Sequence, residues 1–119
     1  MEYISTRNKQ TAFSFKDVFL KGLAPDGGLF VPKKIPVFTN QELKECKSFS
    51  YNKLAAKIIY KFCSDEFTEN EVIDLVNKSY KNFNSKDIVE IKEIGKLNLL
   101  ELFYGPTLAF KDIAMQVIG

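Results

Sequence analysis

Lys111 is the residue of this sequence whose type and setting best suit covalent chemistry. It follows the turn-forming pair Gly105-Pro106, where the pattern predicts the first turn of a helix over residues 110–118. The partial positive charge of a helix N-terminus disfavours the ammonium form of a lysine, and apolar neighbours such as Leu108 and Phe110 add desolvation. An amine that is partly neutral near neutral pH is a nucleophile suited to Schiff-base chemistry with a carbonyl group. An ordinary solvated lysine beside a capping turn fits the same spacing, so both interpretations stay open.

Four other polar residues are candidates for supporting roles. Thr107 and Asp112 flank the lysine and could orient its loop through a cap or a hydrogen bond, although plain N-terminal capping explains them equally well. Tyr104 can donate a hydrogen bond but carries no positive charge at neutral pH. Arg7 could bind a phosphate group through its forked guanidinium, and an exposed or salt-bridged arginine is the simpler alternative.

Short helices and strands are expected to position these residues. Residues 3–5 and 29–31 have the composition of short strands, and the glycine-rich stretch 24–28 between them is typical of a turn rather than a phosphate-binding loop. Four helices are predicted to begin after a Ser or Thr N-cap, three of them with an acidic residue three positions later. These N-caps are Ser14, Thr39, Ser50 and Thr68.

The helices are expected to bury one apolar face each and to form a small core of their own. The predicted inward residues of the last two helices are Leu54, Ile58, Ile59, Phe62, Val72, Leu75 and Val76, followed by Ser79 or Tyr80. Polar turn residues near 83–85 then mark the edge of this core. The alternating segments 88–94 and 97–103 predict a hairpin. The expected fold class is therefore α/β, with α+β character in this chain: a mostly helical domain over 1–84 and the start of an α/β domain over 85–119.

Composition excludes several classes of function. The chain has 119 residues, a net charge of +2 and scattered lysines, which predicts no binding to nucleic acid. Its lack of histidine excludes a histidine base and most zinc sites, and Cys46 and Cys63 lack metal-binding spacing. No apolar run approaches the ~18 residues of a membrane span, and the N-terminus has no signal-peptide core. We therefore expect a soluble cytoplasmic protein with reduced thiols and no membrane contact.

Three segments of the sequence resemble one enzyme family. Residues 101–112, ELFYGPTLAFKD, resemble the lysine segment of threonine synthases, which usually reads ELFHGPTLAFKD. Residues 3–7, YISTR, resemble that family's opening YxSTR, and residues 22–32, GLAPDGGLFVP, resemble its GLAPDGGLYVP stretch. The three motifs occur in the family's order and at its spacing, and together they extend over most of the chain.

This resemblance implies a pyridoxal phosphate (PLP) enzyme of the tryptophan-synthase-β-like fold, also called fold type II. Such enzymes convert O-phosphohomoserine and water to L-threonine and phosphate, and Lys111 matches the lysine that holds PLP as a Schiff base. Tyr104 stands where the family usually has histidine, and Asn8 where it usually has glycine. Since family members have several hundred residues, we expect an N-terminal fragment whose partner is the remainder of the catalytic domain.

Two alternatives remain open at this stage. Threonine-synthase-like relatives can act as phospho-lyases on the same substrate, and the chain by itself could be an inert folding or interaction module. The glycine-rich loop that holds the PLP phosphate in the family has no counterpart here, so the isolated chain is expected to bind PLP weakly and to be inactive. Its C-terminal part is expected to expose apolar side chains and to self-associate or be partly disordered. The side chains predicted to lack partners are Leu99, Phe103, Ile113, Val117 and Ile118.

Overall fold

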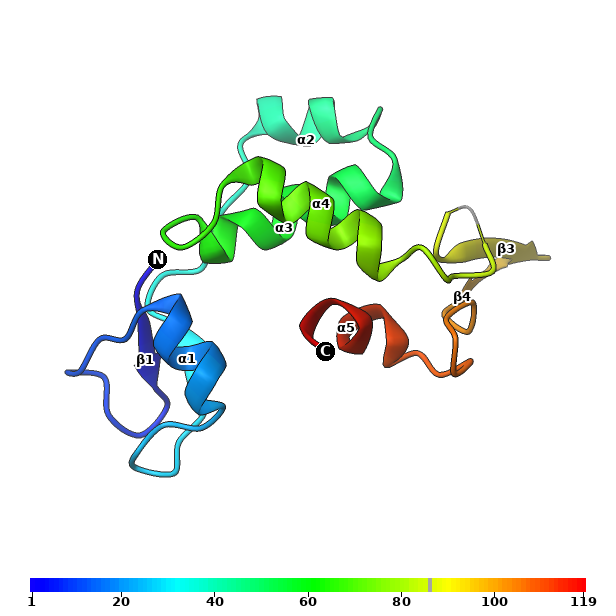
Figure 1. Cartoon of the computed structure of the whole chain (residues 1–119). Helices are drawn as coiled ribbons and strands as arrows, with labels where there is room; N and C mark the ends of the chain where they lie inside the picture. The colour runs from blue at the N-terminus through cyan, green and yellow to red at the C-terminus, as the bar shows by residue number, and fades with distance from the viewer. Residues whose placement is uncertain (86) are drawn as a thin grey trace.

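A computed structural model describes residues 1–85 and 87–119 of the chain. Over these residues the chain forms five helices and two two-stranded antiparallel sheets, which confirms the predicted mixed α/β fold. Figure 1 shows α1 and β1 at one end, α2, α3 and α4 together, the β3–β4 hairpin at the other end, and α5 between the ends. The elements are β1 (Tyr3–Ser5), α1 (Phe15–Lys21), β2 (Phe30–Pro32), α2 (Asn40–Cys46), α3 (Tyr51–Cys63), α4 (Glu69–Ser79), β3 (Glu90–Ile94), β4 (Leu97–Glu101) and α5 (Asp112–Ile118).

The starts of the first four helices follow from side-chain capping. In each case the hydroxyl of the predicted Ser or Thr N-cap accepts a hydrogen bond from a main-chain N–H of the first turn. In α1, α2 and α4 the acidic residue three positions on accepts from the N-cap N–H, which completes a capping box. Gly22 ends α1 with a φ of 69°, a conformation that glycine adopts at little cost. All four predicted N-caps are therefore confirmed.

The first sheet joins the two N-terminal motifs. Strands β1 and β2 are antiparallel, with Tyr3 opposite Pro32 and Ser5 opposite Phe30. The second strand lies one residue later than predicted, because Pro32 pairs within the strand instead of closing it. A proline is tolerated there, since each strand of a two-stranded sheet is an edge.

The hydrophobic core lies between α3 and α4. Its buried members are Ala56, Cys63, Val72, Val76, Tyr80 and Ile88. The predicted inward position is confirmed for Val72 and Val76 but wrong for Ile58 and Leu75, each 41% exposed. The reason is that apolar residues occupy more than one side of each helix, and the buried side of α3 carries the small Ala56 and Cys63.

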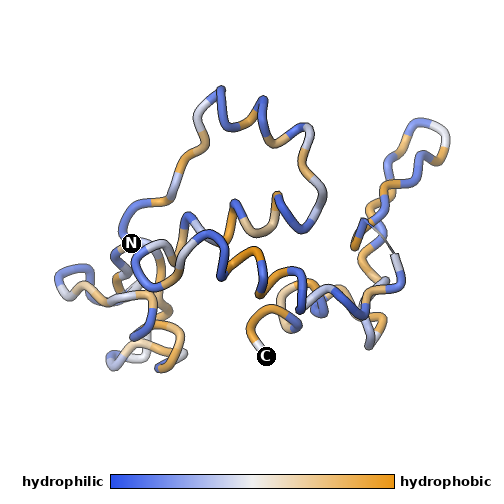
Figure 2. The backbone as a smooth tube through the Cα atoms, turned by 45° about the horizontal axis from the view of Figure 1, so that its top comes forward, coloured by the Kyte–Doolittle hydropathy of each residue, from blue (hydrophilic) through white to orange (hydrophobic). Residues whose placement is uncertain are grey.

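The second sheet is the β3–β4 hairpin, which turns at Gly95 with a φ of 62°. Strand β4 ends at Glu101 and not at Phe103 as predicted, because its partner strand begins at Glu90, which pairs with Glu101. In Figure 2 the hairpin extends away from the helices and mixes hydrophobic with hydrophilic residues.

Three of the five side chains predicted to lack partners are exposed by about half. They are Leu99, Phe103 and Ile118. Ile113 and Val117 are instead partly buried: Val117 packs against the helical core, and both side chains line an apolar cavity beside it. The domain boundary at 84/85 stays a prediction, and the core extends across it to Ile88. Within the described part of the chain, no helix has the length and apolarity needed to cross a membrane.

Candidate functional site

Lys111 occupies the N-cap position of α5. Its backbone is already helical, with φ −63° and ψ −22°, and its carbonyl oxygen accepts a hydrogen bond from Met115 N–H at 2.8 Å. The helix starts at Asp112, so the predicted start near residue 110 was two residues early. The lysine side chain is exposed. The structure therefore leaves the amine open to a reagent in solution.

The apolar neighbours do not surround the lysine as the sequence predicted. Leu108 is 65% exposed and Phe110 is 64% exposed, so this chain does not supply the expected burial. Leu108 also adopts a φ of 61°, and its N–H donates to the Gly105 carbonyl at 3.1 Å. A left-handed conformation at a branched residue costs on the order of 1–3 kcal/mol and persists only where the surroundings enforce it. The loop before Lys111 therefore has a defined, strained shape.

Thr107 and Asp112 are hydrogen-bonded to each other across the lysine loop. The main-chain N–H and the hydroxyl of Thr107 donate to the two carboxylate oxygens of Asp112, each at 2.8 Å. Asp112 is 3% exposed, and an added Cβ at Gly105 would lie 2.4 Å from its Cβ, so only glycine fits there. Burial acts to raise the pKa of Asp112, but the hydrogen bonds to its carboxylate, those from Thr107 first, together outweigh burial and keep that pKa below its ordinary value. An ionised carboxylate therefore holds the loop closed.

Tyr104 is engaged with the hairpin. Its hydroxyl donates a short hydrogen bond to Glu101 Oε2, and Lys92 Nζ lies 3.1 Å from the same oxygen. The Glu101 carboxylate is the main cause that raises the pKa of Tyr104, and the Tyr104 hydroxyl in turn lowers the pKa of Glu101. Tyr104 therefore stays protonated and anchors the start of the lysine segment to β4.

Arg7 belongs to a second cluster that joins two of the sequence motifs. Arg7 Nη1 donates to the Asp26 carbonyl at 3.0 Å, while Ser5 Oγ donates to Asp26 Oδ1 at 2.7 Å. Gly28 N–H donates to the same Oδ1 at 2.9 Å, and a Cβ on Gly28 would lie 2.2 Å from Ser5 Oγ. These bonds, that from Ser5 above all, lower the pKa of Asp26. The 3–7 and 22–32 motifs thus interlock, a contact that the sequence analysis missed because neither motif indicates its partner.

The structure does not bring the predicted site residues together in one place. Lys111, Thr107 and Asp112 form one group at the start of α5, and Tyr104 leads into it. Arg7 follows β1, which lies well away from the segment that precedes α5 (Figure 1). One guanidinium nitrogen of Arg7 is used to hold the turn, and its role as a phosphate ligand stays a prediction.

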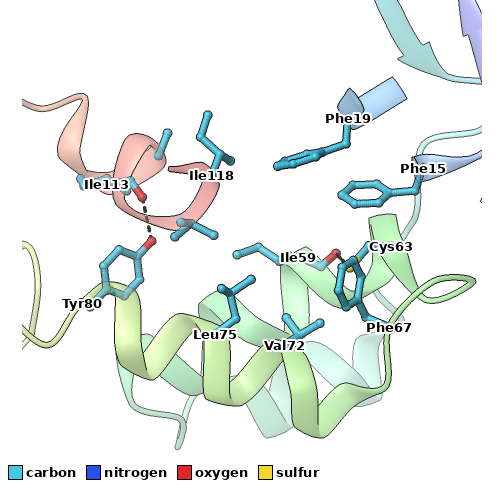
Figure 3. A pocket seen from close by; sticks show the side chains of 12 residues that line it. Phe15, Phe19, Ile59, Cys63, Phe67, Val72, Leu75, Tyr80, Ile113 and Ile118 are labelled. Carbon is cyan, nitrogen blue, oxygen red and sulfur yellow. Dashed lines mark hydrogen bonds between the residues drawn. The ribbon is translucent and has the colours of Figure 1, made fainter. Parts of the chain in front are cut away.

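Sequence reasoning also missed Tyr80 as a neighbour of the lysine segment. Tyr80 is 5% exposed at the end of α4, and its hydroxyl donates to the Ile113 carbonyl at 2.8 Å (Figure 3). Its helical spacing had suggested only a core position. No local pattern indicates a hydrogen bond to a residue 33 positions away.

An apolar cavity of about 380 Å³ lies beside this contact (Figure 3). Helices α1, α3, α4 and α5 contribute to its lining. Cys63 is among the lining residues, its thiol donates to the Ile59 carbonyl at 3.4 Å, and burial raises its pKa. This thiol is therefore unsuited to act as a nucleophile.

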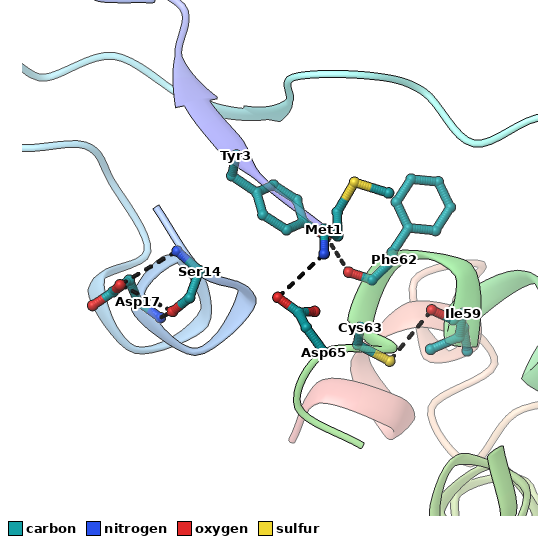
Figure 4. Close-up of polar contacts among 8 residues, drawn as sticks. All are labelled: Met1, Tyr3, Ser14, Asp17, Ile59, Phe62, Cys63 and Asp65. Carbon is teal, nitrogen blue, oxygen red and sulfur yellow. Dashed lines mark hydrogen bonds and ion pairs between the residues drawn. The ribbon is translucent and has the colours of Figure 1, made fainter. Parts of the chain in front are cut away.

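The N-terminal segment is tied to the end of α3 and to the turn after it by polar contacts (Figure 4). Tyr3 Oη donates to the Phe62 carbonyl at 2.6 Å, and the N-terminal amine of Met1 lies 3.2 Å from Asp65 Oδ2. Burial is the main cause that raises the pKa of Tyr3 to about 12. The first sheet is thereby fixed to the helical core.

Comparisons with known proteins identify the family to which this chain is similar. Residues 2–80 match the family model described as the threonine synthase N terminus. The chain is 38% identical over its full length to threonine synthase of Pseudomonas aeruginosa, of which it covers 26%, and 37% identical to threonine synthase-like 2 of Xenopus laevis, again with 26% covered. Its structure superposes on a PLP-bound threonine synthase from Brucella melitensis with a TM-score of 0.93 and 35% identity, covering 99% of this chain and 26% of that one.

The chain thus spans about a quarter of the length of the curated relatives it matches. The family model alone covers well over half of its residues and includes both interlocked motifs. The chain belongs to the threonine synthase N-terminal family.

Proposed function

We propose that this chain forms the N-terminal, lysine-bearing part of a PLP-dependent threonine synthase, a carbon–oxygen lyase acting on phosphate, in the cytoplasm. Its reaction converts O-phosphohomoserine and water to L-threonine and phosphate. The observation that carries the proposal is the match of almost the whole chain to a PLP-bound threonine synthase at a TM-score of 0.93. The exposed amine of Lys111, at the end of a hydrogen-bonded loop, supports it.

The residues present fit one end of PLP, its aldehyde. Lys111 Nζ is a primary amine open to solvent, and the Thr107–Asp112 bonds hold the loop that carries it. When bound, PLP supplies an electron sink for carbanion chemistry. In this proposal Lys111 Nζ binds the aldehyde carbon of the cofactor, and the same nitrogen would transfer protons when it is free. Thr107 and Asp112 orient the loop. Tyr104 fixes the start of that loop, and Arg7 is kept as a candidate ligand for the substrate phosphate.

A chimeric enzyme tests the proposal directly. The matched N-terminal quarter of the Pseudomonas aeruginosa threonine synthase is replaced by residues 1–119 and expressed in a threonine auxotroph. We expect growth without threonine for the chimera and for the control Lys96→Ala, which changes an exposed lysine of the hairpin turn. Lys111→Ala is expected to abolish growth, and growth of that variant would refute the assignment of Lys111.

The phospho-lyase alternative is kept because of one observation. The sequence identity of the chain is 37% to a threonine synthase-like 2 protein and 38% to a threonine synthase. Sequence identity therefore does not favour one of the two reactions over the other. Incubating the chimera with O-phosphohomoserine and separating the products decides between them. Threonine supports the synthase, whereas a keto acid supports the lyase.

The isolated chain is proposed to be inactive and to need the remainder of a catalytic domain as its partner. Mixing it with PLP, reducing with borohydride and mapping the labelled peptides by mass spectrometry tests how much of the site it holds. Labelling of Lys111 well above that of the other lysines supports a built amine site. Uniform labelling favours the alternative of a folding or interaction module.

A further inference from the structure

We propose that Tyr80 is a positioning residue for Lys111, because the end of α4 and the turn after it hold the lysine segment, residues 104–113, on both sides of the lysine. The inference rests on the proposed function, since holding the Lys111 amine in one position matters only if that amine binds the cofactor. It concerns residues of the helical part, which lie outside the ELFYGPTLAFKD motif.

Two hydrogen bonds hold the segment. Before the lysine, Asn84 N–H donates to the Tyr104 carbonyl at 2.8 Å. After it, Tyr80 Oη donates to the Ile113 carbonyl at 2.8 Å (Figure 3). Residues 80 and 84 are close in sequence, so the short segment 80–84 holds both ends of the ten residues 104–113. The first bond is formed by main-chain atoms, whereas the second depends on the identity of the side chain at position 80.

Tyr80 itself is rigidly placed. Its ring makes edge-to-face contacts with Tyr51 and Phe83, with centroids 5.7 and 5.1 Å apart. Burial, with a smaller effect of Tyr51, raises the pKa of Tyr80 to about 12. The hydroxyl is therefore a donor at any physiological pH, and its direction is fixed by the packing of the ring.

The helix that receives this bond depends on its docking. Helix α5 has seven residues, and helices of that length are not stable on their own. Its contacts with the helical part are the Tyr80 bond and apolar packing that includes Val117. Because the cavity beside Tyr80 and Ile113 is apolar, its lining offers little to replace a lost hydroxyl. Loss of the bond should therefore loosen α5 and, with it, Lys111 at its N-cap.

The chain contains a matched control for this bond. Tyr3 is 6% exposed, its hydroxyl also donates to a main-chain carbonyl of a helix, and its pKa is likewise raised to about 12, mainly by burial. Its bond ties β1 to α3 (Figure 4). Tyr3→Phe thus removes the same chemistry as Tyr80→Phe at a place away from the lysine segment.

The experiment compares Tyr80→Phe with Tyr3→Phe in the 119-residue chain. Hydrogen exchange followed by mass spectrometry is measured on peptides covering residues 104–118. PLP trapping by borohydride is measured at Lys111 relative to the exposed Lys78 of α4. We expect Tyr80→Phe to speed exchange in 104–118 and to lower the relative labelling of Lys111, each by roughly five- to tenfold, the effect of one lost hydrogen bond. Tyr3→Phe should change neither quantity, and 4-aminophenylalanine at position 80, which keeps a donor, should restore both.

Several outcomes would overturn the role of Tyr80. These are equal exchange in the two Phe variants, unchanged Lys111 labelling in Tyr80→Phe, or no difference between the aminophenylalanine and Phe variants at position 80. A wild-type chain that labels Lys111 no faster than Lys78 counts instead against the proposed function. The exchange comparison then still decides whether Tyr80 fixes the segment.

Discussion

The helical core and the β3–β4 hairpin differ in how far they bury their apolar side chains. In the core, Val76 is fully buried and Val72 is 2% exposed between α3 and α4. In the hairpin, Leu97 is 74% exposed and Ile91 is 68% exposed, although both are large apolar side chains. The helical part thus encloses a core of its own, whereas no apolar side chain of β3 or β4 is buried. We infer from this difference that the stability of the chain resides in the helical core and not in the hairpin.

The lysine segment lies between these two regions and differs from both. It buries little apolar surface, and polar contacts define its shape: Thr107 with Asp112, Tyr80 with Ile113, and the main chain of Asn84. Directional bonds fix an amine in position without enclosing it. This arrangement suits a residue that must stay accessible to a ligand.

The largest expected effect is in the core. Val76→Ala removes two buried methyl groups and leaves a cavity, so it should lower the free energy of unfolding by about 2–3 kcal/mol. The control Leu75→Ala, next to it on α4 but 41% exposed, should cost clearly less. Urea unfolding followed by circular dichroism measures both. Equal losses would mean that the core is not where stability resides.

A second prediction concerns the tight contact in the lysine segment. Gly105→Ala places a Cβ 2.4 Å from the Cβ of Asp112, so the loop must shift. Overpacking of this kind costs about 1–3 kcal/mol, and here it should also displace the Thr107–Asp112 bonds. We expect reduced borohydride trapping of PLP at Lys111, with a smaller change for the control Pro106→Ala, whose side chain is exposed. Trapping unchanged in Gly105→Ala would show that the loop geometry does not matter to the amine.

Local signals in the sequence predicted the elements well and their packing less well. The Ser14 and Thr68 caps fixed helix starts because capping involves residues three positions apart. Burial of Ala56 rather than Ile58 depended on which side of α3 meets α4, a choice that helical periodicity leaves open. In the candidate site, the place of Lys111 at the start of a helix was predicted from its motif, and its chemical role stays a prediction. The bonds from Ser5 to Asp26 and from Tyr80 to Ile113 were not found, since each joins residues distant in sequence and nothing nearby marks the partner.

A third prediction tests whether the ion pair between Glu42 of α2 and Lys61 of α3 stabilises the fold. Lys61 Nζ lies 2.6 Å from Glu42 Oε1, and this lysine, with the Thr39 cap, lowers the pKa of Glu42 from 4.5 to about 2. A lowered carboxyl pKa contributes stability above the unfolded value, and that contribution is lost as the pH falls from about 4.5 toward about 2. Glu42→Gln should therefore flatten the loss of stability in this window, measured as urea midpoints against pH.

Lys61→Gln provides the matched test of cause. It removes the main cause of the lowered Glu42 pKa, so it should reduce the loss of stability over the same pH window. The double variant should differ little from either single variant, because both remove the same interaction. Additive effects of the two substitutions would show that the pair is not coupled. The effect at neutral pH is expected to be smaller than that of Val76→Ala, because both side chains are partly exposed.

The smallest effect on stability is expected in the hairpin, and it is the sharpest test of the comparison. Leu97→Lys changes a side chain that is 74% exposed, so the free energy of unfolding should move by less than about 0.5 kcal/mol. The same change places a charge on an exposed apolar strand edge, which opposes pairing between copies of the chain. Sedimentation velocity should then show less self-association than for wild type, with Lys96→Leu changing it in the opposite direction. If Leu97→Lys instead destabilised the monomer strongly, the hairpin would contribute to the fold as the core does, and the distinction between the two regions would fail.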